Sequence, residues 1–218
     1  MLYRLFLKEL TLELKRKSVI SGLALYLFST VFIYYITFSL HQNVISPLVW
    51  SALFWATMLF TAVSTVAKSF IGEKKGQDIY YYSIVAPELV ILSKIIYNFV
   101  LCSLLGFFGY CLFIILLGNP IADIPLFALI LILTSLGFAT SLTLLSGLAG
   151  KASNSTVVMA VLSFPLVISI LLLAIKATKN CIDGLDRNAS YDELLTLFAI
   201  NCLVTAMSYL LFPYIWRS

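Results

Sequence analysis

Charged residues are scarce in this sequence, and the long stretches between them contain almost none. Only 11% of the 218 residues are Asp, Glu, Lys or Arg, against about a quarter in soluble globular proteins. The mean hydropathy is +1.04. The chain has a single histidine and four cysteines, with no Cys-x-x-Cys pair and no Cys/His pair at metal-ligand spacing. The composition therefore excludes an ordinary soluble domain, and we expect neither a structural metal site nor a disulfide framework.

Six apolar runs account for most of the chain. An α-helix rises about 1.5 Å per residue, so about 20 apolar residues cross the ~30 Å hydrocarbon core of a bilayer. Each run meets or nearly meets that length. We predict an all-α membrane protein that forms a single permease-like domain over residues 1–218, with six transmembrane helices at 19–40, 48–69, 95–118, 126–149, 156–175 and 194–216 and the last four within 95–216.

Basic residues are concentrated on one side of these runs. Arg4, Lys8 and Lys15 to Lys17 precede the first run, and Lys68, Lys74, Lys75 and Lys94 follow the second. The long loop predicted from Lys176 to Glu193 has more acidic than basic residues. Because basic loops stay on the cytoplasmic side, both termini are predicted to be cytoplasmic. The net charge of +4 is then explained by the orientation of the protein in the membrane and by attraction to anionic lipid. It requires no nucleic-acid partner.

The N-terminal segment Met1–Ser18 has the pattern of an amphipathic helix. Its apolar residues recur at helical spacing, whereas Arg4, Lys8, Glu9 and Lys15 fall mostly on other faces. We expect this helix to lie in the membrane interface with its charges in water. It is either a simple anchor or a brace against a soluble partner. The residues that can share the apolar face are Leu2, Leu5, Phe6, Leu10 and Leu14.

The segment Phe70–Lys94 is too polar in its first half to span a membrane and too apolar in its second half to be a solvated loop. Gly72 and Gly76 bracket a charged turn, and three consecutive tyrosines follow at 80–82. Tyrosine rings suit a headgroup layer or a protein surface. The segment is predicted either to dock a partner on the cytoplasmic side or to re-enter the interface without one.

The predicted helices carry no acidic or basic residue at mid-depth. Ion-coupled carriers keep such groups inside the bilayer, so coupling to an ion gradient is disfavoured. Gly147–Ala152 lacks the spacing of a phosphate-binding loop and ends an apolar helix, and the chain has no His-Glu-x-x-His motif. We therefore predict that the protein is not an enzyme and that any ATP is hydrolysed by another chain.

Small residues and one proline are expected to shape the packing of the helices. Pro165 lies in the middle of the fifth predicted span and should kink it. A static bend is favoured over a hinge, because neighbouring groups can satisfy the freed carbonyl. The small residues expected to allow close helix approach are Ser103, Gly106, Gly109, Ser146, Gly147 and Gly150.

Two tracts of the sequence resemble a known family. Phe70, Glu73, Gly76, Tyr81, Tyr82, Ser83, Pro87 and Lys94 resemble the cytoplasmic coupling segment of ABC exporter permeases. The tract from Met159 to Pro165, with Lys151 to Asn154 before it, is similar to that of the CcmB family, the heme exporter protein B of cytochrome c maturation. The resemblance covers nearly the whole chain.

This resemblance implies a permease subunit in a bacterial inner membrane, with an ABC exporter permease-like fold. Its partners would be the ATPase CcmA, the membrane proteins CcmC and CcmD, and a periplasmic heme chaperone whose loaded form ATP hydrolysis releases. Heme would be transported or held by the complex; no cofactor is assigned to this chain, and His41 is expected to be a polar residue at the headgroup boundary. The residues implied to couple to the ATPase are Phe70, Glu73, Gly76, Tyr81, Tyr82, Pro87 and Lys94.

Two other functions fit the same residues. A permease of another ABC exporter, for a drug, a lipid or a polysaccharide, would share the segment from Glu73 to Lys94. A membrane assembly scaffold would use its helices only to hold neighbouring proteins. An ATPase that copurifies with the chain would separate the first function from the second.

Overall fold

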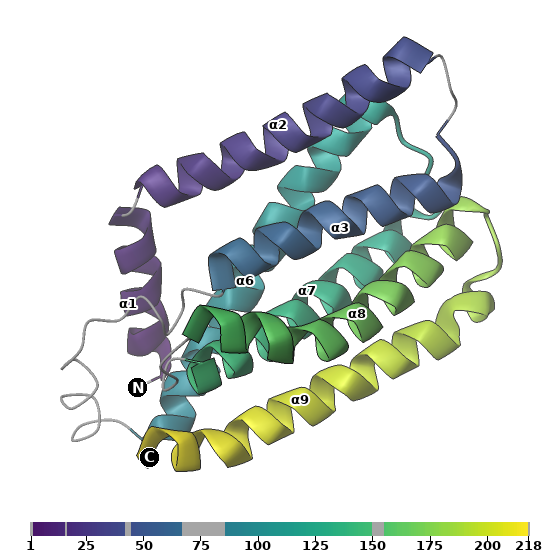
Figure 1. The fold of residues 1–218 in the computed structure, drawn as a ribbon. Helices are drawn as coiled ribbons and strands as arrows, with labels where there is room; N and C mark the ends of the chain where they lie inside the picture. Colours follow the sequence, from purple (N-terminus) through teal and green to yellow (C-terminus); the bar gives the residue numbers. More distant parts are fainter. Residues whose placement is uncertain (1, 16, 42–44, 67–85, 150–154, 218) are drawn as a thin grey trace.

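The computed structural model describes residues 2–15, 17–41, 45–66, 86–149 and 155–217, and these residues are almost entirely helical (Figure 1). A short helix, α1, precedes the longer ones, and a 3₁₀ turn, η1, precedes the last. The elements are α1 (Leu2–Lys15), α2 (Lys17–His41), α3 (Pro47–Val66), α6 (Pro87–Leu117), α7 (Ile124–Ala149), α8 (Ser155–Ile182), η1 (Arg187–Ser190) and α9 (Tyr191–Arg217).

Six of the helices, α2, α3, α6, α7, α8 and α9, are long and apolar enough to cross a membrane. The predicted six-span all-α fold and the separate N-terminal helix are therefore confirmed. The third span was predicted to begin at residue 95, but α6 begins at Pro87. Proline suits the first position of a helix, because the N–H that it lacks would have no partner within the helix there. Glu88 adds a negative charge at the positive end of the helix dipole. With 31 residues, α6 is about 46 Å long and exceeds the hydrocarbon thickness.

The predicted bounds of the fifth span and of the loop after it were also wrong. Helix α8 continues to Ile182, so Lys176 lies inside the helix and not in a loop. Ion pairs permit this extension: Lys176 Nζ lies 2.7 Å from Glu193 Oε1 of α9, and Lys179 Nζ lies 3.6 Å from Asp183 Oδ2. The connection between α8 and α9 is correspondingly short, with Gly184 at a φ of 67° followed by η1.

Helix α7 forms the centre of the bundle and packs against α3, α6, α8 and α9. Its buried surface is rich in small and hydroxyl side chains, including Ser135, Gly137, Ala139 and Ser146. Without a hydrophobic force between helices in lipid, such residues stabilise association by allowing close approach. A Cβ added at Gly106 of α6 would lie 3.2 Å from Leu131 of α7, so the predicted packing role of this glycine is confirmed.

Aromatic rings fill the core on the side of the bundle away from the chain termini. Trp50 stacks on Phe54 with centroids 5.5 Å apart, and Phe113 meets both rings edge to face. The ring of Phe127 in α7 belongs to the same group, and its centroid lies 5.5 Å from that of Phe54. These geometries are the favourable ones for aromatic pairs, and they join α3, α6 and α7.

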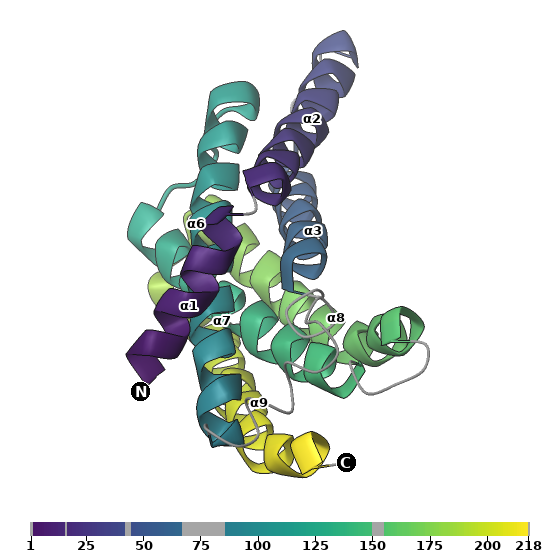
Figure 2. The same cartoon turned by 90° about the vertical axis from the view of Figure 1, so that its left-hand side faces the viewer.

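Both chain termini lie at the same end of the bundle, here called the terminal end (Figure 1). Helix α1 runs across this end, steeply inclined to the spanning helices (Figures 1 and 2). An even number of crossings requires both termini to be on one side of the membrane, so this arrangement agrees with the six spans. Helix α6 begins at the terminal end, next to the last turns of α9.

Candidate coupling site at the terminal end

A buried lysine joins α1 to α6 at the terminal end. Lys94 lies two turns into α6 with 1% of its side chain exposed, and its Nζ is 3.6 Å from Oε1 of Glu9 in α1. The Glu9 side chain is 17% exposed. Burial of an ammonium group is expensive unless a counter-charge and hydrogen bonds accompany it. The position of α1 is therefore linked electrostatically to the first turns of α6.

An apolar cluster lies at the same junction. Val90, Ile91 and Ile95 of α6 pack with Phe212 of α9, and Leu5 of α1 with Leu89 covers the cluster. Three helices that are far apart in sequence are thus joined at one point. Displacement of α1 would open both the ion pair and this cluster, so the junction can pass a movement from α1 to α6 and α9.

The contacts of α1 correct part of the prediction for this helix. Leu5 was expected to face the acyl boundary, but it packs against the apolar cluster that α6 forms with Phe212. Glu9 was expected to face water, but it is mostly buried against Lys94. The periodicity of the sequence identified an amphipathic helix correctly; it could not identify a protein surface as its partner. Tyr3 and Leu7 stay exposed on other sides of the helix.

The predicted coupling residues divide into two groups. Pro87 is the first residue of α6. Lys94, predicted to end the cytoplasmic coupling segment before the third span, is buried inside that helix, because α6 begins at Pro87. The remaining five, Phe70, Glu73, Gly76, Tyr81 and Tyr82, lie outside the described residues.

Pro165 lies inside α8, as predicted, and the helix continues through it. Ser169 Oγ donates a hydrogen bond to the carbonyl of Pro165 at 3.0 Å. The static bend of α8 at Pro165 stays a prediction.

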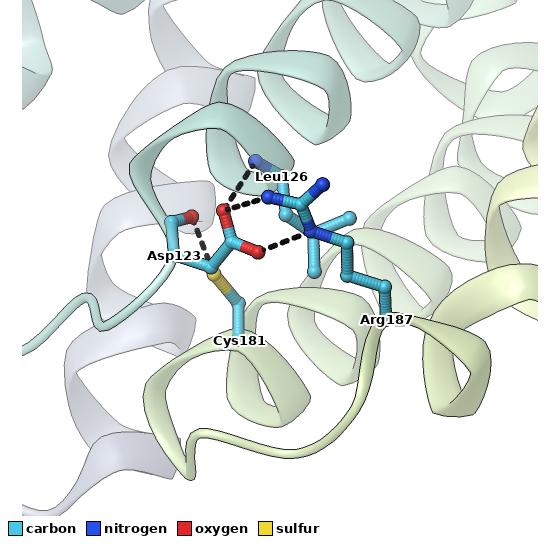
Figure 3. Close-up of polar contacts among 4 residues, drawn as sticks. All are labelled: Asp123, Leu126, Cys181 and Arg187. Carbon is cyan, nitrogen blue, oxygen red and sulfur yellow. Dashed lines mark hydrogen bonds and ion pairs between the residues drawn. The ribbon is translucent and has the colours of Figure 1, made fainter.

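A second polar site lies at the opposite end of the bundle (Figure 3). Asp123 precedes α7 and accepts a hydrogen bond from Leu126 N–H at 3.1 Å, so its carboxylate caps this helix. Arg187 of η1 binds both carboxylate oxygens, with Nε 2.6 Å from Oδ2 and Nη2 3.3 Å from Oδ1. The Cys181 thiol donates to the Asp123 carbonyl at 3.0 Å. One aspartate therefore connects α7, α8 and the turn before α9.

We expect this site to make the stability of the protein depend on pH in the acid range. The hydrogen bond from Arg187, with that from Leu126 N–H, lowers the pKa of Asp123 from its ordinary value of 3.8. A lowered folded-state pKa contributes stability above the ordinary value, and this contribution is lost as pH falls through the lower one. Asp123→Asn should therefore lower the thermal unfolding midpoint at about pH 6, and the difference from the unmodified protein should shrink towards about pH 3.

Asp186→Asn is the matched control, because Asp186 is an exposed aspartate beside the same turn. It should leave the midpoint nearly unchanged at every pH. An Asp123→Asn midpoint that stays below that of the unmodified protein by the same amount down to low pH would contradict the titration argument.

Three polar contacts between helices were not anticipated from the sequence. Trp55 Nε1 donates to Thr178 Oγ1 at 2.8 Å, Asn98 Nδ2 to Thr143 Oγ1 at 2.8 Å, and Asn201 Nδ2 to the carbonyl of Leu133 at 2.9 Å. Asparagine inside an apolar run is the signal that could have identified two of them, since a polar side chain in lipid requires a partner. The sequence does not indicate which helix supplies it.

Comparison with known protein families agrees with the fold and with the resemblance of the sequence. A family model described as CcmB protein matches residues 1–212. The chain belongs to the CcmB family. It is the heme exporter permease subunit of the ABC system of cytochrome c maturation, and the ATPase of that system is CcmA. No curated protein matches the sequence.

Membership in the CcmB family explains the composition of the chain. A multi-pass permease subunit requires spanning helices and a contact for its ATPase, and the hydrolytic machinery belongs to the partner. Among the described residues, no group of three or more His, Cys, Asp or Glu side chains could hold a metal ion. The four cysteines, at 102, 111, 181 and 202, are all free.

Proposed function

We propose that this CcmB protein transmits force from CcmA to the membrane-spanning bundle, and that the terminal end is its cytoplasmic, ATPase-facing end. Both termini would then be cytoplasmic. The distribution of lysine and arginine supports this orientation, since Arg4, Lys8 and Lys94 belong to segments at that end. The segments that receive the force would be Met1–Ser18 and Phe70–Lys94.

The main support for this proposal is the junction of α1 with α6, which consists of the Glu9–Lys94 ion pair and the apolar cluster beside it. A permease driven by a separate ATPase needs two arrangements of its helices that respond differently to the nucleotide state. A movement imposed on α1 would reach α6 through Lys94, and it would reach α9 through the apolar cluster in which Phe212 packs with α6. Both α6 and α9 pack on the central helix α7, so the movement can continue into the bundle.

The further partners in this proposal follow from the family. CcmC-like and CcmD-like membrane proteins would bind the lipid-facing sides of the bundle, and a heme chaperone would be released on the periplasmic side of the bacterial inner membrane. Heme is the cargo of the pathway, and the proposal assigns it no ligand in this chain.

Charge reversal in the coupling segment tests the proposal. We expect Glu73→Lys combined with Tyr81→Ala and Tyr82→Ala to abolish copurification of CcmA with the tagged chain in mild detergent. The physical reason is the loss of a charged and aromatic contact surface, and such residues dominate the energetics of protein interfaces.

Asp186→Lys is the matched control, because it reverses an exposed charge at the opposite end. It should leave CcmA bound. Full retention of CcmA by the triple variant would show that Phe70–Lys94 is not the docking segment.

A further inference from the structure

Helix α9 contains a proline close to the junction of α1 with α6. Pro213 lies inside the helix, which ends about one turn later at Arg217. Proline has no N–H to donate to the carbonyl of Tyr209, and its ring crowds that carbonyl, so a helix bends at such a residue. Figures 1 and 2 both show the last turns of α9 leaving the direction of the rest of the helix.

The residue directly before this proline joins α9 to the apolar cluster at the terminal end. Phe212 packs with three apolar residues of α6, and only 1% of it is exposed. Its neighbours differ sharply, because Leu211 is 41% exposed and Tyr214 is 77% exposed. The contact of this end of α9 with the cluster therefore depends on one aromatic side chain at the bend.

The pattern of buried residues in α9 does not by itself select Phe212. A line of buried positions runs along the helix through Leu194, Asn201 and Ser208, seven residues apart. Continued along a straight helix, this line passes between Leu211 and Phe212, so both would be buried to similar extents. Since α9 buries Phe212 and exposes Leu211, the direction of its last turns decides which side chain reaches α6.

We infer that Pro213 is a positioning residue: its bend directs Phe212 onto α6, and this contact joins α9 to the junction of α1 with α6. In a straight α9 the ring lies beside the cluster and not within it. The packing of Phe212 belongs to this chain alone and does not depend on CcmA. The consequence for export rests on the proposed function, because it requires a movement that enters the bundle at this junction.

The bend gives the junction a second connection to the centre of the bundle. Helix α6 packs on α7 along its own length. Asn201 of α9 donates a hydrogen bond to the carbonyl of Leu133 in α7 at 2.9 Å. A displacement of the cluster thus reaches α7 through two helices. Loss of the bend removes one of these routes and leaves the other, so it should reduce export without abolishing it.

A double-mutant cycle in the purified full-length chain tests whether Pro213 acts through Phe212. Phe212→Ala should lower the thermal unfolding midpoint in detergent, because it truncates a buried aromatic side chain. With Pro213→Ala already present, the ring has left the cluster, and Phe212→Ala should lower the midpoint by less than about half as much. The measurement requires no CcmA.

Phe113→Ala is the matched control, because Phe113 is an equally buried phenylalanine of α6 in the aromatic core away from the terminal end. It should lower the midpoint equally with and without Pro213→Ala. An equal effect of Phe212→Ala in both backgrounds would show that Phe212 keeps its place without the proline, and would overturn the inference. A reduced effect of Phe113→Ala as well would indicate a general loosening of the bundle, and would also overturn it.

The yield of mature cytochrome c per folded chain in the membrane measures the consequence for export. Pro213→Ala should lower it by about fivefold. Phe212→Ala should have a similar effect, and the double variant should be no worse than Pro213→Ala alone, since both changes break the same contact. Full yield with Pro213→Ala, beside a cycle that shows its coupling to Phe212, would remove α9 from the coupling path and overturn the inference. The proposed function would then still be tested separately by the ion pair between α1 and α6.

Discussion

Reversal of the charge on Glu9 is expected to uncouple the permease from its ATPase. Lys94 is almost fully buried, and its Nζ lies 3.6 Å from Oε1 of Glu9. A lysine at position 9 would place a second positive charge close to this Nζ. Two like charges there would push α1 away from α6 and expose the cluster around Leu5. We expect the yield of mature cytochrome c in cells carrying Glu9→Lys to fall by about tenfold or more, because coupling free energies between sites are typically 1–3 kcal/mol.

The exchanged pair, Glu9→Lys with Lys94→Glu, separates electrostatic coupling from a general loss of folding. It restores opposite charges between α1 and α6 and should recover a substantial part of the cytochrome yield. Arg4→Glu is the control for charge on α1, because Arg4 is an exposed residue of the same helix; it should reduce the yield only slightly. Full cytochrome yield with Glu9→Lys would show that the ion pair does not transmit the coupling. The same conclusion follows if the exchanged pair is as defective as Glu9→Lys alone and Lys94→Glu alone.

The spanning helices were predictable because their signal is local. A run of about 20 apolar residues has few alternatives to a membrane helix, since a backbone in hydrocarbon must satisfy its own hydrogen bonds. The errors fell at the ends of helices, where polar residues occur. Pro87 and Glu88 form a start for α6, and Lys176 is tolerated inside α8 by Glu193. Glu193 belongs to another helix, and the hydropathy of one segment takes no account of it. Hydropathy alone therefore places the end of α8 too early.

The candidate site could be predicted only in part, for a related reason. Lys94 was selected because of the family resemblance, and Glu9 was recognised as part of an amphipathic helix. Their contact joins positions 85 residues apart and depends on the angle at which α1 crosses the bundle. The same limit applies to Asp123 and Arg187, which meet only because α8 and α9 bring η1 beside the start of α7. Periodicity assigns a face to a helix but not the surface that covers it.

Gly137, at the centre of α7, is the position where added volume should damage the fold most. A Cβ built there would lie 2.8 Å from Oδ1 of Asn201 in α9 and 3.2 Å from Cδ1 of Ile170 in α8. The Asn201 side chain cannot easily turn away, because its Nδ2 is bonded to the Leu133 carbonyl. Overpacking of a filled core costs about 1–3 kcal/mol, and the helix preference of alanine over glycine offsets at most about 1 kcal/mol.

We therefore expect Gly137→Ala to lower the free energy of unfolding by about 1–2 kcal/mol, and Gly137→Leu to abolish recovery of folded protein from the membrane. Unfolding in detergent, followed by circular dichroism, measures the first, and the monodisperse fraction in size-exclusion chromatography measures the second. Gly22→Ala is the matched control, because a Cβ there meets nothing within 4 Å; it should be neutral or slightly stabilising.

A double variant identifies the contact responsible. If the clash with Oδ1 dominates, Gly137→Ala and Asn201→Ala together should destabilise the protein by less than the sum of the two single variants, since the second change removes the atom that the new methyl group meets. Strict additivity would assign the effect to Ile170 instead. In either case α7 must approach its neighbours this closely for α6, α8 and α9 to pack on it together, so the movement proposed to begin at α1 would act on a tightly packed helix.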